Sequence, residues 1–201
     1  GIAFITKYLN SEAVFLTATM PNFIQWMQQH VMSSLSFRNL IADQSCFSVF
    51  QKCTYHYLSY ISQEGLLEKA KQNPSSLIIV NKRRTARELY HSCGGKKYHL
   101  STYMTALDRS RVIKEIKEEL DCLERDDALE KEIPEERRIT VISTSLIEAG
   151  VDLDFHTVFR ELSGLEHILQ SAGRCNREGK RKSGDDYIFE WEEERGKPKK
   201  D

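Results

Sequence analysis

Short apolar runs alternate with stretches of helical periodicity along most of this 201-residue chain. The run Leu-Ile-Ile-Val at 77–80 contains no polar residue, and Ile-Thr-Val-Ile at 139–142 contains one. Such runs are typical of strands that are covered on both faces, as in parallel sheets. Parallel neighbours need a crossover, usually a helix, between them. The alternation therefore predicts an α/β domain whose mostly parallel sheet is flanked by helices.

The same periodicity assigns the remaining elements. Asn81 is expected to cap the helix that follows 77–80, and Gly94-Gly95 to end it. Two four-residue patterns, Thr105-x-x-Asp108 and Ser163-x-x-Glu166, predict capping boxes at the starts of two further helices. The highly charged stretch 124–137 predicts a helix end and an exposed loop. Further strands are expected at 53–60, 97–101, 158–159 and 187–189, and a further helix at 64–72.

Length and charge limit the classes of protein to consider. The chain is too short for two full α/β domains of roughly 150 residues each. It carries 29 basic and 30 acidic residues, and this balance leaves nucleic acid open as a partner, since binding needs only a local basic patch. No apolar run approaches the roughly 18–20 residues of a membrane span. Five cysteines without a Cys-x-x-Cys pair favour reduced thiols over a disulfide framework or a zinc site. We therefore expect a cytoplasmic protein with no membrane contact and no metal ligands of its own.

The sharpest chemical pattern is Gln170-Ser-Ala-Gly-Arg174-Cys-Asn-Arg177. In a continuous helix, Gln170, Arg174 and Arg177 would share one face, because they are spaced i, i+4 and i+7. Two guanidiniums and an amide on one face suit a multiply charged anion such as a triphosphate. Gly173 would allow a ligand to approach the backbone closely. A solvated basic helix face explains this pattern, taken alone, equally well.

A second pattern follows the apolar run at 139–142. Thr144 comes directly after that strand, at a place where α/β proteins often bind ligands. Gly150 permits a tight backbone path, and Asp152 offers an acceptor for a ribose or a cationic partner. An ordinary capped helix is the alternative interpretation.

Weaker signals lie at three other strand ends. Thr17 ends an apolar run at 13–17 and Thr19 follows it, and both could relay hydrogen bonds between two sites, but taken alone this motif is better explained as an ordinary strand end. Polar or basic groups also come near predicted helix starts, where phosphate is well received. These are Asn81, Ser101, Thr102 and Arg109. Charged surface helices would give much the same pattern. The chain has no Gly-x-x-x-x-Gly-Lys-Ser/Thr loop, the usual phosphate cradle of nucleotide hydrolases.

In this order the motifs resemble those of superfamily-two helicases. Thr17-Ala-Thr-Met-Pro resembles motif III, and Leu77-Ile-Ile-Val-Asn81 resembles motif IV. The stretch Leu100-Ser-Thr resembles the next nucleic-acid motif. Motif V corresponds to Thr144…Gly150-Val-Asp152, and motif VI to Gln170-x-x-Gly-Arg174-x-x-Arg177. The amino-acid sequences of the last two motifs are similar to those of the CRISPR-associated type I helicase–nuclease family, the Cas-three family.

That resemblance implies a RecA-like fold of the P-loop NTPase type, the second helicase domain of a motor that moves on single-stranded DNA with ATP and Mg²⁺. It implies that 1–25 ends the preceding lobe, 26–52 links the lobes, 53–191 forms the second lobe and 192–201 is a charged tail. The implied partners are the first lobe, a nuclease domain and an RNA-guided surveillance complex. We expect the chain alone to bind no cofactor and to turn over no ATP.

The resemblance also implies roles for individual residues. Arg174 and Arg177 would be arginine fingers, and Gln170 would contact the nucleotide phosphates or the attacking water. Nucleotide contacts would come from Gly150, Asp152 and Gly173; DNA contacts from Thr144, Asn81, Ser101, Thr102 and Arg109; coupling between the lobes from Thr17 and Thr19.

Two alternatives stay open from the sequence. One is the motor lobe of another superfamily-two DNA or RNA helicase. The other is a non-catalytic module of RecA-like fold that binds nucleic acid or protein, which the missing phosphate loop would suit.

Overall fold

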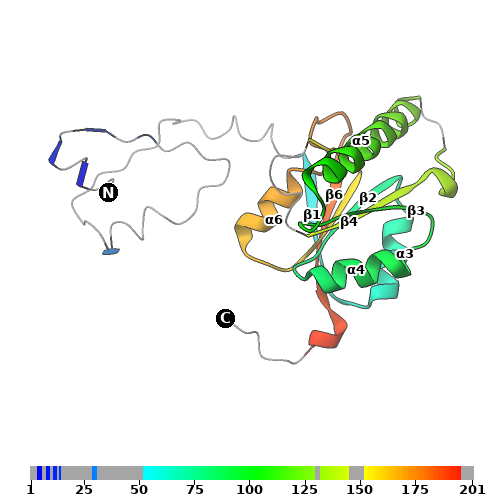
Figure 1. Cartoon of the computed structure of the whole chain (residues 1–201), viewed down its shortest axis with the longest axis horizontal. Helices are drawn as coiled ribbons and strands as arrows, with labels where there is room; N and C mark the ends of the chain where they lie inside the picture. Colours follow the sequence, from blue (N-terminus) through cyan, green and yellow to red (C-terminus); the bar gives the residue numbers. More distant parts are fainter. Residues whose placement is uncertain are drawn as a thin grey trace. The chain divides into compact units, whose positions relative to one another are not determined.

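The computed structural model describes residues 52–129, 132–144 and 152–195, together with nine positions before residue 31. Two compact units divide the chain, residues 1–49 and 50–201. The predicted coupling residues Thr17 and Thr19, and Gly150 of the second pattern, lie outside the described residues. The domain boundaries inferred from the sequence remain predictions. All the described strands lie in the second unit (Figure 1).

Six strands form one sheet in the order β1-β6-β5-β2-β4-β3, and every neighbouring pair is parallel. The predicted parallel α/β sheet is thus confirmed. The strands are β1 (Cys53–Ile61), β2 (Ser75–Ile79), β3 (Lys96–Leu100), β4 (Ile139–Ser143), β5 (Thr157–Glu161) and β6 (Gly184–Trp191). The helices are α3 (Gln63–Lys71), α4 (Arg83–Ser92), α5 (Ala106–Ala128) and α6 (Leu165–Ala172), and the 3₁₀ turns are η2 (Glu135–Arg137) and η4 (Glu192–Glu194).

Helices cover both faces of the sheet, as two separate apolar clusters demonstrate. On one face, side chains of α3 and α4 such as Leu66 and Leu89 pack against Ile78 of the central strand β2. On the other face, Ile116 of α5 packs against Leu77 of the same strand. Because successive residues of a strand point to opposite faces, the wholly apolar run of β2 fills both clusters at once.

Two predicted caps are corrected and one is confirmed. Thr105 accepts a hydrogen bond from the Asp108 amide at 3.1 Å, as the first capping box requires. Helix α6 instead begins after Gly164, without a side-chain cap, so the box at Ser163 is wrong. Asn81 does not cap α4, whose N-cap is Lys82. The end of β5 holds the side chain of Asn81 instead.

Crossover direction decides which residues lie at which edge of the sheet. All strands end at one edge, called here the carboxyl edge, and begin at the other, the amino edge. Because α6 starts after β5 ends and returns the chain to the start of β6, the residues that follow α6 lie at the amino edge. Among the described residues, no helix is long and apolar enough to cross a membrane.

Candidate functional site

The two predicted arginines follow the end of α6 rather than lying on it. The helix ends at Ala172 and Gly173 is its C-cap, so only Gln170 is helical. The backbone beyond the cap pairs with residue 155 instead: the Phe155 amide donates to the carbonyl oxygen of Arg174 at 2.9 Å. The expectation of one helix face carrying Gln170, Arg174 and Arg177 is therefore wrong, because a bridge to a neighbouring segment replaces the next helical turn.

Both arginines also lie at the edge of the sheet opposite to Asn81 and Thr144, which follow strand ends. Arg174 and Arg177 lie beside residues 152–155, which precede β5, and therefore at the amino edge rather than the carboxyl edge. The reason is the crossover geometry of α6, which carries the chain back past the full length of β5. The two sharpest chemical patterns, which the resemblance assigns to one nucleotide, nevertheless meet here.

Asp154 joins these two patterns through three hydrogen bonds. One carboxylate oxygen accepts from the Arg177 amide at 2.8 Å and from the Arg181 guanidinium at 2.7 Å. The other accepts from the Glu178 amide at 3.1 Å. Arg181 also donates to the carbonyl oxygen of Phe155 at 2.8 Å. We call Asp154, Asn176, Arg177, Glu178 and Arg181 the Asp154 network.

Asn176 shapes the turn within this network. Its φ of 48° is left-handed, a region in which asparagine is enriched among non-glycine residues. The buried side-chain amide donates to the carbonyl oxygens of Lys52 and Arg181, both at 2.9 Å, and its oxygen accepts from the Arg181 amide at 3.1 Å. Every polar atom of the side chain is thus used to hold the loop. Directly beneath it Gly184 is required, because a Cβ there would lie 2.4 Å from Sγ of Cys175.

The two arginines differ in their surroundings. Arg174 is buried, and burial, followed by the charge of nearby Arg177, lowers the pKa of its guanidinium. The Arg177 side chain is 42% exposed, and its Nε lies 3.1 Å from a carboxylate oxygen of Asp152. Since Asp152 is itself mostly exposed, this ion pair is a weak one, worth up to about 1 kcal/mol. Asp152, expected at a ribose, contacts an arginine in this structure.

A small cavity of about 30 Å³ lies between α5 and residues 152–154. Carboxylates predominate around it, so this cavity would repel an anion such as phosphate. Among the residues that the structure describes, no three His, Cys, Asp or Glu side chains are grouped as a metal site would need. The acidic members of the lining are Asp121, Glu124, Asp152, Asp154 and Glu178.

At the carboxyl edge, Asn81 binds the end of β5. Its side-chain nitrogen donates to the carbonyl oxygen of Leu162 at 2.9 Å, and its side-chain oxygen accepts from Nη1 of Arg160 at 2.7 Å. The Asn81 amide donates to the carboxylate of Glu161 at 2.8 Å. Arg160 is buried and was not identified from the sequence, where its position inside the apolar strand β5 gave no signal. Asn81 therefore stabilises the contact between the residues after β2 and the end of β5.

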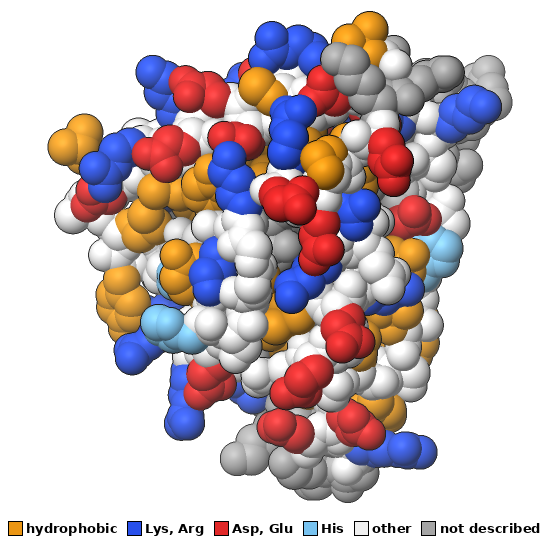
Figure 2. Space-filling model, turned by 90° about the vertical axis from the view of Figure 1, so that its right-hand side faces the viewer, with side chains coloured by type: hydrophobic (Ala, Val, Ile, Leu, Met, Phe, Trp, Pro, Cys, Tyr) orange, Lys and Arg blue, Asp and Glu red, His pale blue; other side chains and the backbone are white. Residues whose placement is uncertain are grey.

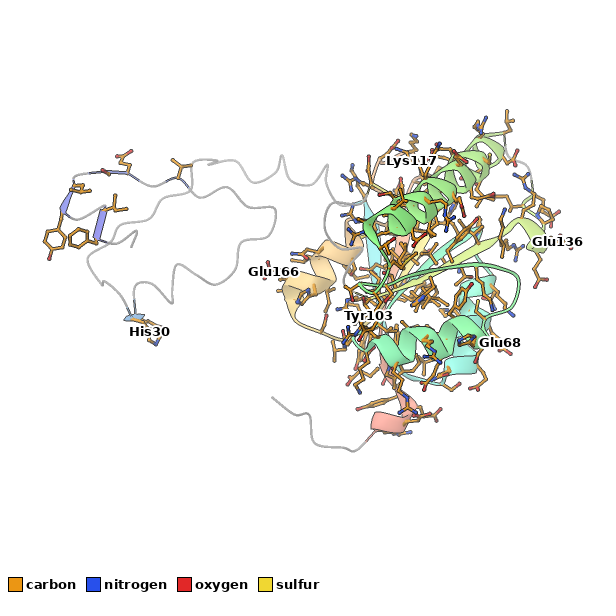
Figure 3. All side chains as sticks on the ribbon, in the orientation of Figure 1. His30, Glu68, Tyr103, Lys117, Glu136 and Glu166 are labelled. Carbon is orange, nitrogen blue, oxygen red and sulfur yellow. The ribbon has the colours of Figure 1, made fainter. Side chains whose placement is uncertain are left out.

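The other predicted DNA-contacting residues also gather at this edge but differ in exposure. Thr102 is exposed and Arg109 is half-buried, whereas Ser101 and Thr144 are buried. The Ser101 hydroxyl accepts from the Tyr103 amide at 3.3 Å and so holds the turn after β3. Figure 3 shows Tyr103 and Glu166 on the side where their strands end, and Glu136 on the opposite side. Figure 2 shows that opposite side, where basic and acidic side chains are interspersed.

The predicted nucleotide residues Asp152, Arg174 and Arg177 and the predicted nucleic-acid residues therefore lie at opposite edges of the sheet. Strands β2 and β5, which run from one edge to the other, are each five residues long, so the two edges are roughly 17 Å apart. Three residues that organise the amino-edge group, Asp154, Asn176 and Arg181, were missed as functional positions. Only their closeness in sequence to Asp152 and Arg174 could have drawn attention to them.

The chain is similar to known proteins in sequence and in fold. Residues 72–180 match the C-terminal domain family of the CRISPR-associated nuclease/helicase Cas3. The CRISPR-associated nuclease/helicase Cas3 of Methanothermobacter thermautotrophicus is 35% identical over 198 residues, which cover 92% of this chain and 22% of the archaeal protein. This chain thus spans about a fifth of that relative's length.

Two solved structures share the fold. T. fusca Cas3 with ADP aligns with a TM-score of 0.55 at 17% identity, over 72% of this chain and 19% of that one. S. cerevisiae Dbp5 bound to RNA and ADP BeF₃ aligns with a TM-score of 0.55 at 16% identity, over 88% and 44% of the two chains. The sheet is therefore that of a RecA-like helicase domain, as predicted.

Proposed function

The chain belongs to the CRISPR-associated Cas3 nuclease/helicase family, as its C-terminal helicase domain, and on that premise we propose that it is the second motor lobe of an ATP-dependent single-stranded DNA translocase. In this proposal the Asp154 network presents arginine fingers to a nucleotide held by the first lobe. The carboxyl edge binds the DNA backbone. ATP supplies the energy of each step, and Mg²⁺ is held by the phosphates and the other lobe.

The observation that carries the proposal is the Asp154 network itself. Its hydrogen bonds fix the backbone of Arg177 and the loop that carries Arg174, so that two guanidiniums lie on one preorganised segment. Preorganised charge near a transferring phosphoryl group stabilises the transition state without reorganisation at the moment of reaction. An arginine so placed is worth about 10³–10⁵ in rate in well-studied nucleotide hydrolases.

The pair between Arg177 and Asp152 supports a switching role for Arg177. Both side chains are substantially exposed, so little free energy is lost when the guanidinium leaves the carboxylate for a phosphate. Asp152 would then hold Arg177 near its working position between nucleotides. Gln170 lies in the last turn of α6, and Gly173 directly after it, so both can approach the same nucleotide.

The carboxyl edge supports the nucleic-acid part of the proposal. Thr102 is exposed and Arg109 is half-buried there, while buried Ser101 fixes the turn after β3, from which such contacts would be made. Contacts with phosphate and sugar bind DNA without regard to sequence, as a translocase needs. The first lobe, a nuclease domain and an RNA-guided surveillance complex are the partners proposed with this activity.

The test is ATP hydrolysis by the full-length nuclease/helicase that contains this lobe. Arg177→Ala should lower DNA-stimulated turnover by about 10³-fold or more, with a smaller effect on nucleotide affinity. Because Arg174 is buried, Arg174→Lys is the better variant there: it keeps the charge but loses the planar fork. Arg111→Ala, which removes an exposed arginine on α5, serves as the control. Parental turnover by Arg177→Ala would refute the finger assignment.

A further inference from the structure

An exposed aromatic ring and an arginine stack on each other at the carboxyl edge. The guanidinium carbon of Arg83, the first residue of α4, lies 4.3 Å from the ring centroid of Tyr103, in the turn after β3. This distance is well within the range of a cation–π contact. Tyr103 is nonetheless 76% exposed, so most of its ring is accessible to solvent. Figure 3 labels this residue at the carboxyl edge.

The pair sits above the strand end at which the sequence predicted a DNA contact. Strand β4 lies between β2 and β3, so a contact between the residues after β2 and those after β3 spans the end of β4. Thr144, which follows β4, is buried there. A ligand that arrives at this point of the edge therefore meets the ring of Tyr103 and the guanidinium of Arg83 rather than the threonine hydroxyl.

The surroundings of the pair favour an anionic ligand. Lys82, Arg83 and Arg84 are all exposed, and the first turn of α4 contains no acidic residue, although Glu88 in the second turn pairs with Arg84 at 2.7 Å. The turn that carries Tyr103 is fixed, because the Tyr103 amide donates to the Ser101 hydroxyl and the Met104 amide donates to the Ser101 carbonyl at 3.1 Å. A rigid aromatic ring beside several cations is the combination with which proteins bind single-stranded nucleic acid, through stacked bases and neutralised phosphates.

We propose that Tyr103, backed by Arg83, is a stacking platform for a base of single-stranded DNA at the carboxyl edge of this lobe. The proposal rests on the proposed motor function and adds a base contact to backbone contacts. Arg83 covers one side of the ring and holds it in place, and a base stacks on the exposed part. The guanidinium also neutralises an adjoining phosphate.

Titration of the 201-residue chain with fluorescent oligothymidylate at low salt tests the platform, with and without abasic sites in the oligonucleotide. Tyr103→Ala should weaken binding to the intact oligonucleotide by about fivefold or more, the lower range for loss of one stacked base. Tyr103→Phe should bind like the parent. The control is Tyr57→Ala, which removes another exposed tyrosine, on β1. The hydroxyl of Tyr57 donates to the carboxylate of Glu190.

Abasic sites separate stacking from a loss of structure. The parent chain should lose affinity for the abasic oligonucleotide, whereas Tyr103→Ala should bind both oligonucleotides alike. A parent chain that binds DNA but does not distinguish the two, or a Tyr103→Ala variant with parental affinity, overturns the platform and leaves the proposed function standing. If the parent chain binds no single-stranded DNA at all, the DNA-binding part of the proposed function falls together with the platform.

Discussion

The Asp154 network and the carboxyl edge use polar side chains in opposite ways. In the network, Asp154, Asn176 and Arg181 direct their polar atoms mostly at one another and at nearby backbone. At the carboxyl edge, Thr102 and Tyr103 are exposed to solvent. The difference indicates that the network positions a few groups by making them rigid, while the edge keeps groups accessible to a ligand.

This contrast has a physical basis in burial. A buried polar group without a partner is costly, so truncating a little-exposed side chain of the network, such as Asp154 or Asn176, should destabilise the fold. An exposed polar group can replace a hydrogen bond to protein with one to water at little cost, so exposed residues of the edge can be substituted without much loss of stability. Substitutions of little-exposed network side chains should therefore change the free energy of unfolding, and those of exposed edge side chains such as Thr102 should change binding alone.

The largest effect is expected from Asp186, which lies two residues after Gly184 on β6. Both carboxylate oxygens are buried and have no hydrogen-bond partner among the described residues, and burial raises the pKa of Asp186 to about 7, although the charge of Arg160 opposes the rise. The folded state therefore keeps a proton that the unfolded state loses, so the contribution of Asp186 to stability should fall as the pH rises from about 4 to about 7, whereas His156, whose pKa is lowered to about 4 by partial burial, contributes in the opposite direction. At pH 8 the ionised form should cost up to about 4 kcal/mol.

Urea unfolding between pH 4 and pH 8 measures this dependence. The free energy of unfolding of Asp186→Asn, measured relative to the parent chain, should rise between pH 4 and pH 7, and the variant should be more stable than the parent chain at pH 8. Equal pH slopes for the two proteins would show that Asp186 does not titrate in this window.

A smaller loss is expected when Asp154 is truncated. Asp154→Ala leaves the little-exposed guanidinium of Arg181 with only Glu124, at 3.8 Å, as a charged partner among the described residues. We expect the free energy of unfolding to fall by about 2–3 kcal/mol. The matched control is Asp152→Ala, which removes an exposed carboxylate two residues away and should cost less than about 1 kcal/mol. Equal losses in the two variants would contradict the contrast between buried and exposed polar groups.

Overpacking beneath the network should cost somewhat less again. Gly184→Ala places a Cβ 2.4 Å from Sγ of Cys175 and 3.0 Å from Cβ of Asn176, so the loop that carries the arginines must shift. We expect a loss of about 2 kcal/mol in thermal or urea unfolding. Gly65→Ala in α3, where a Cβ meets only ordinary contacts from 3.4 Å, should instead stabilise the chain by up to about 1 kcal/mol.

The smallest effect on stability is expected at the carboxyl edge. Thr102→Ala removes an exposed hydroxyl and should change the free energy of unfolding by no more than about 0.5 kcal/mol. Its affinity for single-stranded DNA, measured by fluorescence anisotropy, should nevertheless fall. If Thr102→Ala unfolds more easily than Asp152→Ala, the edge is structural and the comparison between the regions fails.

The sequence alone determined the α/β class, the parallel sheet and the order of the helicase motifs along the chain. It could do so because wholly apolar strand runs and motif order are local properties of the chain. Even the start of α5 at Thr105 could be predicted, since a capping box involves residues three apart.

Only the tertiary structure decided where those motifs lie. Helix α6 ends before Arg174 because the following backbone bonds to residue 155, a partner nineteen positions away. Asn81 leaves its helix uncapped because Arg160 and Leu162, at the end of the neighbouring strand, bind its side chain. In both cases a local preference worth about 1 kcal/mol yields to contacts between distant segments, because sheet order and crossover direction set which segments meet.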